Sequence, residues 1–218
     1  MGQTLEKHTI EENFFISAIN QEIFNRVFPH IRHDLVGYLT TSLMRVSIMD
    51  RYLNKVGLSP EQVKEDLKKI DSQLRDAILG IRELQFWDFD SAHEEYPSRI
   101  LKKSVQLMST HLAMNNIQLL IIPGELEETE MVMTKPLLYC LLCLFSYVED
   151  NNFEHNNLNI SLFPKSVQIT IEPIIAQESA VIKKKRNLFI DQDLVSRFVA
   201  LHSMDLSFVK GGMNLTWH

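Results

Sequence analysis

Ile31-Arg-His-Asp-Leu-Val-Gly-Tyr-Leu39 is the stretch of this 218-residue chain that most constrains its fold. Ile31 and Leu35 are four residues apart, so they lie on one side of a helix. At about 100° per residue, both lie about 160° around that helix from His33. A core that contains Ile31 and Leu35 therefore leaves His33 exposed, and the stretch predicts an amphipathic helix with an ionisable group on its outer side.

The same spacing continues on both sides of this stretch and predicts one long helix over about residues 10–56. Its apolar seam consists of Val27, Ile31, Leu35, Tyr38, Ser42, Val46, Met49 and Leu53. After a stop at Gly57, Ser59-Pro60-Glu61-Gln62 has the N-cap, proline and glutamine typical of a helix start. The helix that follows, over about residues 60–86, carries a second stripe with the same spacing. That stripe consists of Val63, Leu67, Ile70, Leu74, Ala77 or Ile78, Ile81 and Leu84.

Two seams of this length predict an antiparallel helical hairpin. A lone hairpin buries little apolar surface, so we expect two copies to pair as a homodimeric four-helix bundle. Whether residues 1–26 extend the first helix or fold back on the bundle is left open by the sequence.

The second part of the chain changes character after Trp87 and Phe89. Helical and alternating patterns there predict the order α-β-α-β-β-α-β-β, which favours a mixed or antiparallel sheet with helices on one face. The predicted segments are about 98–115, 117–122, 134–148, 158–163, 167–171, 190–203 and two strands within 205–217. The fold class is therefore α+β, a helical hairpin followed by an α/β sandwich.

Composition and charge exclude several functions. A net charge of −6 argues against nucleic-acid binding, which usually requires a basic surface. The short basic run 183–186 is interpreted as a solvated loop, with contact to an anionic partner as the alternative. The longest apolar run, Leu137 to Phe145, is too short to cross a membrane, and no cleavable signal pattern opens the chain. We therefore expect no membrane association and a cytoplasmic protein.

The sequence contains two pairs of potential metal ligands, and neither pair is expected to bind a metal ion. Cys140 and Cys143 lie inside an apolar run and are expected to pack in the core, with a redox pair as the alternative. His30 and His33 have a spacing that metal sites use, but Pro29 disturbs the helix beside them and further ligands are missing. No metal site and no bound cofactor are predicted.

His33 and Asp34 together form a candidate site for nucleophilic chemistry. An exposed imidazole is substantially neutral near pH 7, and its unprotonated nitrogen can attack phosphorus. Asp34 could hold the other ring nitrogen as N–H and stabilise the charge that develops. An ordinary solvated pair on a helix surface is the alternative, because these two residues alone define no site.

The whole arrangement resembles the dimerisation/phosphotransfer and ATPase-like domains of sensor histidine kinases. His33-Asp34-Leu35 is similar to their phosphoacceptor motif, and Arg99 to Ile122 is similar to the entry helix and first strand of the ATPase-like domain. The resemblance implies a helical dimerisation/phosphotransfer domain over residues 1–88 and an ATPase-like α/β domain over residues 89–218.

Departures from the kinase pattern fall at the positions that would bind nucleotide. Cys140 and Leu144 replace asparagines expected to hold Mg²⁺ and phosphate, and Glu172-Pro173-Ile174 replaces the Asp-x-Gly that receives adenine. Residues 187–193 replace the glycine-rich lid, and no Gly-x-Gly occurs in the chain. Backbone amides then cannot approach a triphosphate closely, so the ATPase-like domain is expected to be degenerate and not to bind ATP.

Dimeric phosphotransferases of bacterial phosphorelays combine a kinase-like hairpin with such a degenerate domain. The resemblance implies that His33 takes a phosphoryl group from an aspartate of one response-regulator receiver domain and passes it to another, with Mg²⁺ supplied by the receiver. A hybrid histidine kinase is a further expected partner. Gly37 stands where bifunctional kinases often have a residue that orients water, which implies transfer rather than dephosphorylation.

The receiver is expected to dock on the helix surface that follows His33. The residues predicted to form this surface are Val36, Gly37, Thr40, Thr41 and Met44. Packing in the dimer is the alternative for Val36 and Met44. At the level of the whole protein, the alternatives are a non-catalytic dimeric scaffold or regulator that binds a kinase or response regulator, and an active kinase with an atypical ATP site.

Overall fold

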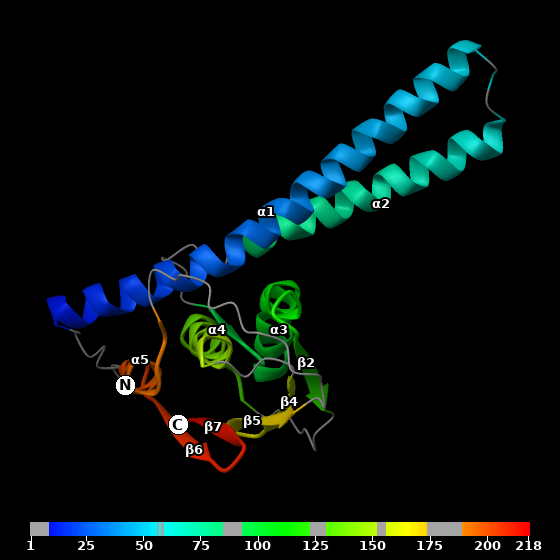
Figure 1. Cartoon of the computed structure of the whole chain (residues 1–218). Coiled ribbons are helices and arrows are strands. Elements are labelled where there is room, and N and C mark those ends of the chain that lie inside the picture. Colours follow the sequence, from blue (N-terminus) through cyan, green and yellow to red (C-terminus); the bar gives the residue numbers. More distant parts are fainter. Residues whose placement is uncertain are drawn as a thin grey trace. The chain divides into compact units, whose positions relative to one another are not determined.

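The computed structural model describes residues 9–55, 57, 59–84, 93–122, 130–151, 156–173 and 189–218. The described residues divide into two compact units. The hairpin unit comprises Phe28–Ser91, and the α/β unit comprises Met1–Val27 together with Ala92–His218. Figure 1 labels their helices and the strands of the larger sheet.

The hairpin unit contains the second half of α1 (Ile10–Lys55) and all of α2 (Pro60–Leu84). The turn between them has the predicted helix stop at Gly57 and the predicted N-cap at Ser59. Gly57 has a φ of 78°, a left-handed conformation that glycine adopts at little cost. The Ser59 amide donates to Gln62 Oε1 at 3.1 Å, and the Gln62 amide donates to Ser59 Oγ at 3.2 Å. This reciprocal capping box satisfies two amides that a helix start would otherwise leave unpaired.

Contacts between α1 and α2 define an antiparallel hairpin. A Cβ added to Gly80 would lie 3.0 Å from Leu35 Cδ2, so the two helices approach closely there. Toward the turn, Ser42 Oγ donates to Gln73 Oε1 at 3.2 Å, and beyond it Arg45 pairs with Asp66 at 3.3 Å. Positions later in α1 thus meet positions earlier in α2.

The predicted seam of α1 is only partly covered within one chain. Ile31 and Ser42 are buried, whereas Val46 is 52% exposed and Leu53 is 55% exposed. The predicted stripe of α2 divides in the same way, because Ala77 is buried while several of its apolar members remain about half exposed. These exposed members are Leu67, Leu74, Ile78 and Ile81. The hairpin therefore presents an apolar face that neither of its own helices covers.

The α/β unit is built on a five-stranded sheet with the order β2-β4-β5-β7-β6. These strands are β2 (Ile117–Ile122), β4 (Asn156–Phe163), β5 (Ser166–Pro173), β6 (Met204–Val209) and β7 (Gly212–Trp217). β2 pairs with β4 in parallel, and the other pairs are antiparallel. Helices α3 (Pro97–Ala113), α4 (Thr134–Asp150) and α5 (Gln192–Leu201) lie on one side of this sheet in Figure 1. A separate small sheet pairs β1 (Glu94–Glu95) with β3 (Val132–Met133).

Apolar and polar side chains alternate along the strands, which explains why the helices cover only one face of the sheet. Leu158, Ile160 and Leu162 of β4 are buried, and Ile169 of β5 is paired with Ile160 in the register. Polar side chains such as Gln168 occupy the intervening positions, so one face of the sheet packs against helices and the other is largely polar. From Leu137 to its end, α4 is buried on all sides.

The first eighteen residues of α1, Ile10–Val27, cluster with the α/β unit, and we call this segment the arm. Thr9 and Glu12 begin it with a second reciprocal cap, because each backbone amide donates to the other's side chain. Ile19, Ile23 and Val27 are at most 1% exposed. The open question about residues before 27 is thereby answered for residues 10–26, which extend the first helix and pack within the α/β unit.

The predicted fold class is confirmed as a helical hairpin followed by a mixed α/β sandwich. The two-residue strands β1 and β3 were not predicted. The predicted domain boundary between residues 88 and 89 lies outside the described residues, as do Trp87 and Phe89. Among the described residues, no helix combines the length and the hydropathy needed to cross a bilayer.

Candidate functional site

His33 projects from α1 as one of its most exposed side chains. The imidazole is 86% exposed, as the helical geometry predicts, and its Nδ1 lies 3.2 Å from Asp34 Oδ1. The Asp34 carboxylate is 46% exposed. If this contact is a hydrogen bond, Nδ1 carries the proton and Nε2 bears the lone pair. Within the described part of the chain, Nε2 has no hydrogen-bond partner.

The surface predicted to follow His33 is present on α1. Val36 and Met44 are each 56% exposed, Gly37 and Thr40 are exposed, and Thr41 is half-buried. Thr41 Oγ1 donates to the carbonyl of Gly37 at 2.8 Å, which leaves its methyl group as the more available part of the side chain. A Cβ added to Gly37 would meet nothing within 4 Å, so the surface beside His33 is open at this position.

Of the positions that the resemblance assigns to nucleotide binding, Cys140 and Leu144 are buried in α4, Glu172 is exposed, and residues 174 and 187–188 lie outside the described residues. Cys140, Cys143 and Leu144 of α4 are 0% exposed. Burial raises the pKa of the Cys140 thiol well above its ordinary value, and burial also raises that of Cys143. Both thiols are therefore protonated core groups. Among the described residues, no group of three histidine, cysteine, aspartate or glutamate side chains is arranged to hold a metal ion.

A buried ionic network in the α/β unit was not anticipated from the sequence. The Arg26 guanidinium contacts Glu22 Oε1 at 3.1 Å, Glu149 Oε2 at 3.4 Å and Asp150 Oδ2 at 2.8 Å. It also donates to the carbonyl of Ser146 at 3.3 Å. Burial lowers the pKa of Arg26, but the hydrogen bond to Asp150 and the surrounding carboxylates outweigh that effect and raise it.

The carboxylates of this network have further partners. His111 Nε2 lies 2.9 Å from Glu149 Oε2, and Asn115 donates to Glu149 Oε1 at 2.6 Å. The amide of Ile190 donates to Asp150 Oδ2 at 2.8 Å. The network thus joins the arm, α3, the end of α4 and the segment before α5. The only sequence signal was a charged side chain, Arg26, beside the seam residue Val27.

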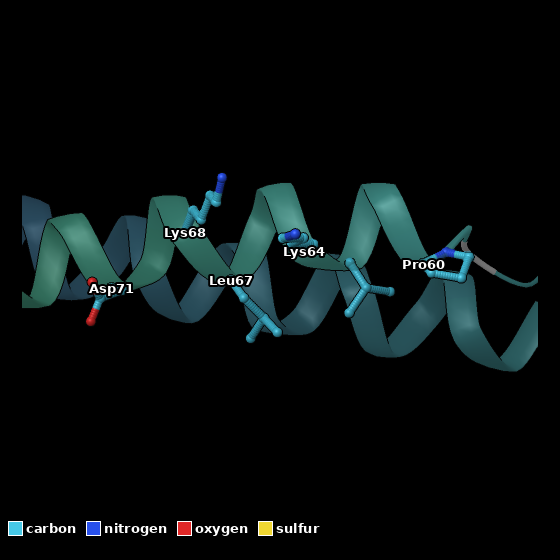
Figure 2. Close-up of a pocket in the computed structure, with 6 residues that line it drawn as sticks. Pro60, Lys64, Leu67, Lys68 and Asp71 are labelled. Carbon is cyan, nitrogen blue, oxygen red and sulfur yellow. The ribbon is translucent and has the colours of Figure 1, made fainter.

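A shallow groove of about 730 Å³ lies on α2 near the hairpin turn, as Figure 2 shows. Its apolar floor includes Val63 and Leu67, and polar side chains flank it. The full lining is Pro60, Val63, Lys64, Leu67, Lys68 and Asp71. All six residues belong to α2, so the groove is part of the uncovered apolar face of the hairpin rather than an enclosed ligand cavity.

No protein-family model matches the chain, and no curated protein matches it. Similar solved structures include the cytoplasmic segment of histidine kinase QseC, with 15% sequence identity over 68% of this chain and 92% of that chain and a TM-score of 0.40. The Acinetobacter baumannii histidine kinase AdeS has 12% identity, covers 85% of this chain and 96% of that chain, and gives a TM-score of 0.38.

A third similar structure is histidine kinase ThkA in complex with response regulator protein TrrA, at 13% identity over 96% of this chain and 66% of that chain, with a TM-score of 0.38. These three structures are histidine kinases or segments of them, and each is similar to this chain at 15% identity or less with a TM-score of 0.40 or less.

Proposed function

We propose that this protein is a histidine phosphotransferase that carries a phosphoryl group on His33 and does not use ATP. The observation that carries the proposal is the exposed imidazole of His33 with its Nδ1 beside the Asp34 carboxylate at 3.2 Å. This arrangement supplies a ring nitrogen, Nε2, on an exposed imidazole and a carboxylate that can balance the positive charge of a phosphorylated ring.

The transfer step uses groups that the hairpin and a receiver domain would provide. Nε2 of His33 attacks the phosphorus of an aspartyl phosphate, the Nε2–P bond forms, and the bond from phosphorus to the aspartate oxygen breaks. The receiver carboxylate leaves with the bonding electrons, and the Nδ1 proton stays beside Asp34. Mg²⁺ held by the receiver would neutralise the charge on the phosphoryl oxygens. The reverse sequence would deliver the group to a second receiver.

The burial of Cys140 and Leu144 in α4 supports a phosphoryl donor other than ATP. A nucleotide site needs chelating or small polar groups that are open to solvent, whereas Cys140 and Leu144 are fully buried and offer neither. This supports the view that the α/β unit serves as a structural body and not as an ATPase. Calorimetric titration with MgATP tests this part of the proposal, because micromolar binding would contradict it.

The exposed residues after His33 are proposed as the docking surface for the receiver. Val36 and Met44 offer apolar contacts, while Gly37 and Thr40 let another backbone approach closely. Thr41 lies at the margin of this surface. Replacement of Met44 by Asp should slow transfer without changing the intrinsic chemistry of His33, because a buried charge at an interface is costly.

A second copy of the chain is proposed to cover the apolar face of the hairpin. Leu67, Leu74, Ile78 and Ile81 of α2 are between 42% and 54% exposed, and the groove in Figure 2 continues this face toward the turn. So much apolar surface on a two-helix hairpin is typical of half of a four-helix bundle. Sedimentation equilibrium should give twice the mass of one chain, and Leu74→Glu should reduce it to a monomer.

Incubation with phosphorylated receiver domains tests the proposed function. Wild-type protein should acquire acid-labile label, and His33→Gln should acquire none. His218 provides a matched control, because it is also an exposed histidine beside a carboxylate, with Nε2 at 2.8 Å from Asp205. His218→Gln should therefore label as wild type does. Absence of label from every cognate receiver would refute the proposal.

The second candidate function is a non-catalytic dimeric scaffold that binds a kinase or response regulator. The exposed apolar residues on both helices of the hairpin favour it, because they would serve a binding function even without phosphoryl transfer. Binding of a receiver that is equally tight for wild type and His33→Gln, together with no label on either, would support this function over phosphotransfer.

A further inference from the structure

Near its C-terminal end the arm is attached to the rest of the α/β unit through charge. Arg26 lies among three carboxylates, and its side chain is 6% exposed while those of Glu149 and Asp150 are 2% and 0% exposed. Removing one partner of a buried ion pair leaves an uncompensated charge in a poorly solvated site, which is far more costly than breaking a surface pair. The attachment is therefore strong only while Arg26 stays in place.

Apolar contacts complete the docked face of the arm, and its other sides are exposed. Ile19, Ile23 and Val27 are buried, but Ile10 is 89% exposed and Phe14 is 76% exposed on other sides of the same helix. Near its beginning the arm also places the Phe15 ring 4.4 Å from the Arg197 guanidinium of α5, a cation–π contact. The arm contributes no strand to the sheet, so its release would leave all five strands paired.

The boundary between the two units coincides with a break in helical hydrogen bonding. The α/β unit ends its first segment at Val27, and the hairpin unit begins at Phe28, within one continuous helix. Pro29 follows immediately and has no N–H to donate to the carbonyl of Asn25. A helix bends most easily where such a bond is missing.

We propose that the arm is a releasable strap, latched by Arg26 on Glu149 and Asp150 and hinged at Pro29. The hairpin unit lies in sequence between the two segments of the α/β unit, and the arm is the first of these two segments. A docked arm is bound to the second segment through side chains, and release of the arm breaks these contacts. The latch thus sets whether the segment that leads into the His33 helix is packed in the α/β unit. This inference does not depend on phosphotransfer.

Hydrogen–deuterium exchange on the full chain tests the latch. Arg26→Met should speed exchange of amides in the arm by about a hundredfold, as expected from the loss of one partner of a buried pair. In wild type and variant alike, amides of β4 and β5 should stay protected far longer than those of the arm, because release of the arm leaves the sheet paired. The control is Arg75→Met, which removes an exposed pair with Asp71 at 2.8 Å and should change neither region.

A second variant separates release of the arm from a general loss of folding. Adding Glu22→Gln, Glu149→Gln and Asp150→Asn to Arg26→Met removes the three stranded charges, so the arm should regain most of its protection. Pro29→Ala restores a helical donor and should slow exchange in the arm severalfold. Arm exchange in Arg26→Met within about threefold of wild type would overturn the latch. So would arm amides that exchange at the same rate as those of β4 and β5, because the two regions would then open together. An unchanged rate in Pro29→Ala would overturn the hinge.

Discussion

Replacement of Ile23 by alanine measures how much the docked arm contributes to the stability of the α/β unit. Ile23 is 0% exposed and lies between Ile19 and Val27, which are also buried. The three carbon atoms removed account for about 2.4 kcal/mol at roughly 0.8 kcal/mol per buried carbon. The cavity left behind adds about 1 kcal/mol, and the better helix propensity of alanine returns about 0.4 kcal/mol. The expected loss of unfolding free energy is therefore about 3 kcal/mol.

Urea unfolding followed by tryptophan fluorescence is the assay. The chain has two tryptophans, and Trp217 is buried in β7 of the α/β unit, so a Trp87→Phe background makes Trp217 the sole reporter. The urea concentration at the midpoint of unfolding should fall, while the slope of the unfolding free energy against urea concentration should not change. The matched control is Phe14→Ala on the exposed side of the arm, which should change stability by no more than about 0.5 kcal/mol. A loss below about 1 kcal/mol for Ile23→Ala would refute a docked arm.

Three further outcomes follow from the packing of glycines and cysteines. Gly212→Ala should cost more than about 2 kcal/mol in urea unfolding, because its Cβ would lie 2.2 Å from the backbone oxygen of Ile169. Gly37→Ala, which meets nothing within 4 Å, should instead gain up to about 1 kcal/mol of helix stability. Burial raises the pKa of Cys140 and of Cys143, so neither thiol should react with an aromatic disulfide reagent at pH 8 until the chain unfolds. Stoichiometric reaction of the native protein would contradict their burial.

The ends of the helices and the exposure of their side chains could be predicted from the sequence, because each depends on residues only a few positions apart. Ser59 and Gln62 form the capping box that their spacing of three indicates, and Gly57 adopts the left-handed conformation that ends the preceding helix. His33 is exposed because Ile31 and Leu35, on the other side of the helix, face the hairpin. The contact between His33 and Asp34 could be predicted because the two residues are adjacent in the sequence.

Long-range contacts could not be predicted in the same way. Arg26 reads as a surface charge in sequence, and its partners Glu149 and Asp150 are more than a hundred residues away. Their spatial proximity depends on the completed α/β unit, which no periodicity encodes. The seam of α1 also combined residues with different environments, since Ile31 is buried whereas Leu53 is about half exposed in the single chain. Spacing identifies an apolar face but does not say which partner covers it.

The insertion of the hairpin into the α/β unit has a consequence for synthesis on the ribosome. Arg26 and Glu149 are separated by 123 positions, and the amide that completes the bonding of Asp150 belongs to Ile190. At about 5–20 residues per second, the arm emerges roughly 6–25 seconds before its partners on α4 exist. The helices of the hairpin need only local contacts and can form during that interval. The arm is therefore made well before it can reach its native environment, and until then its buried face, with Ile19, Ile23 and Val27, is open to chaperones.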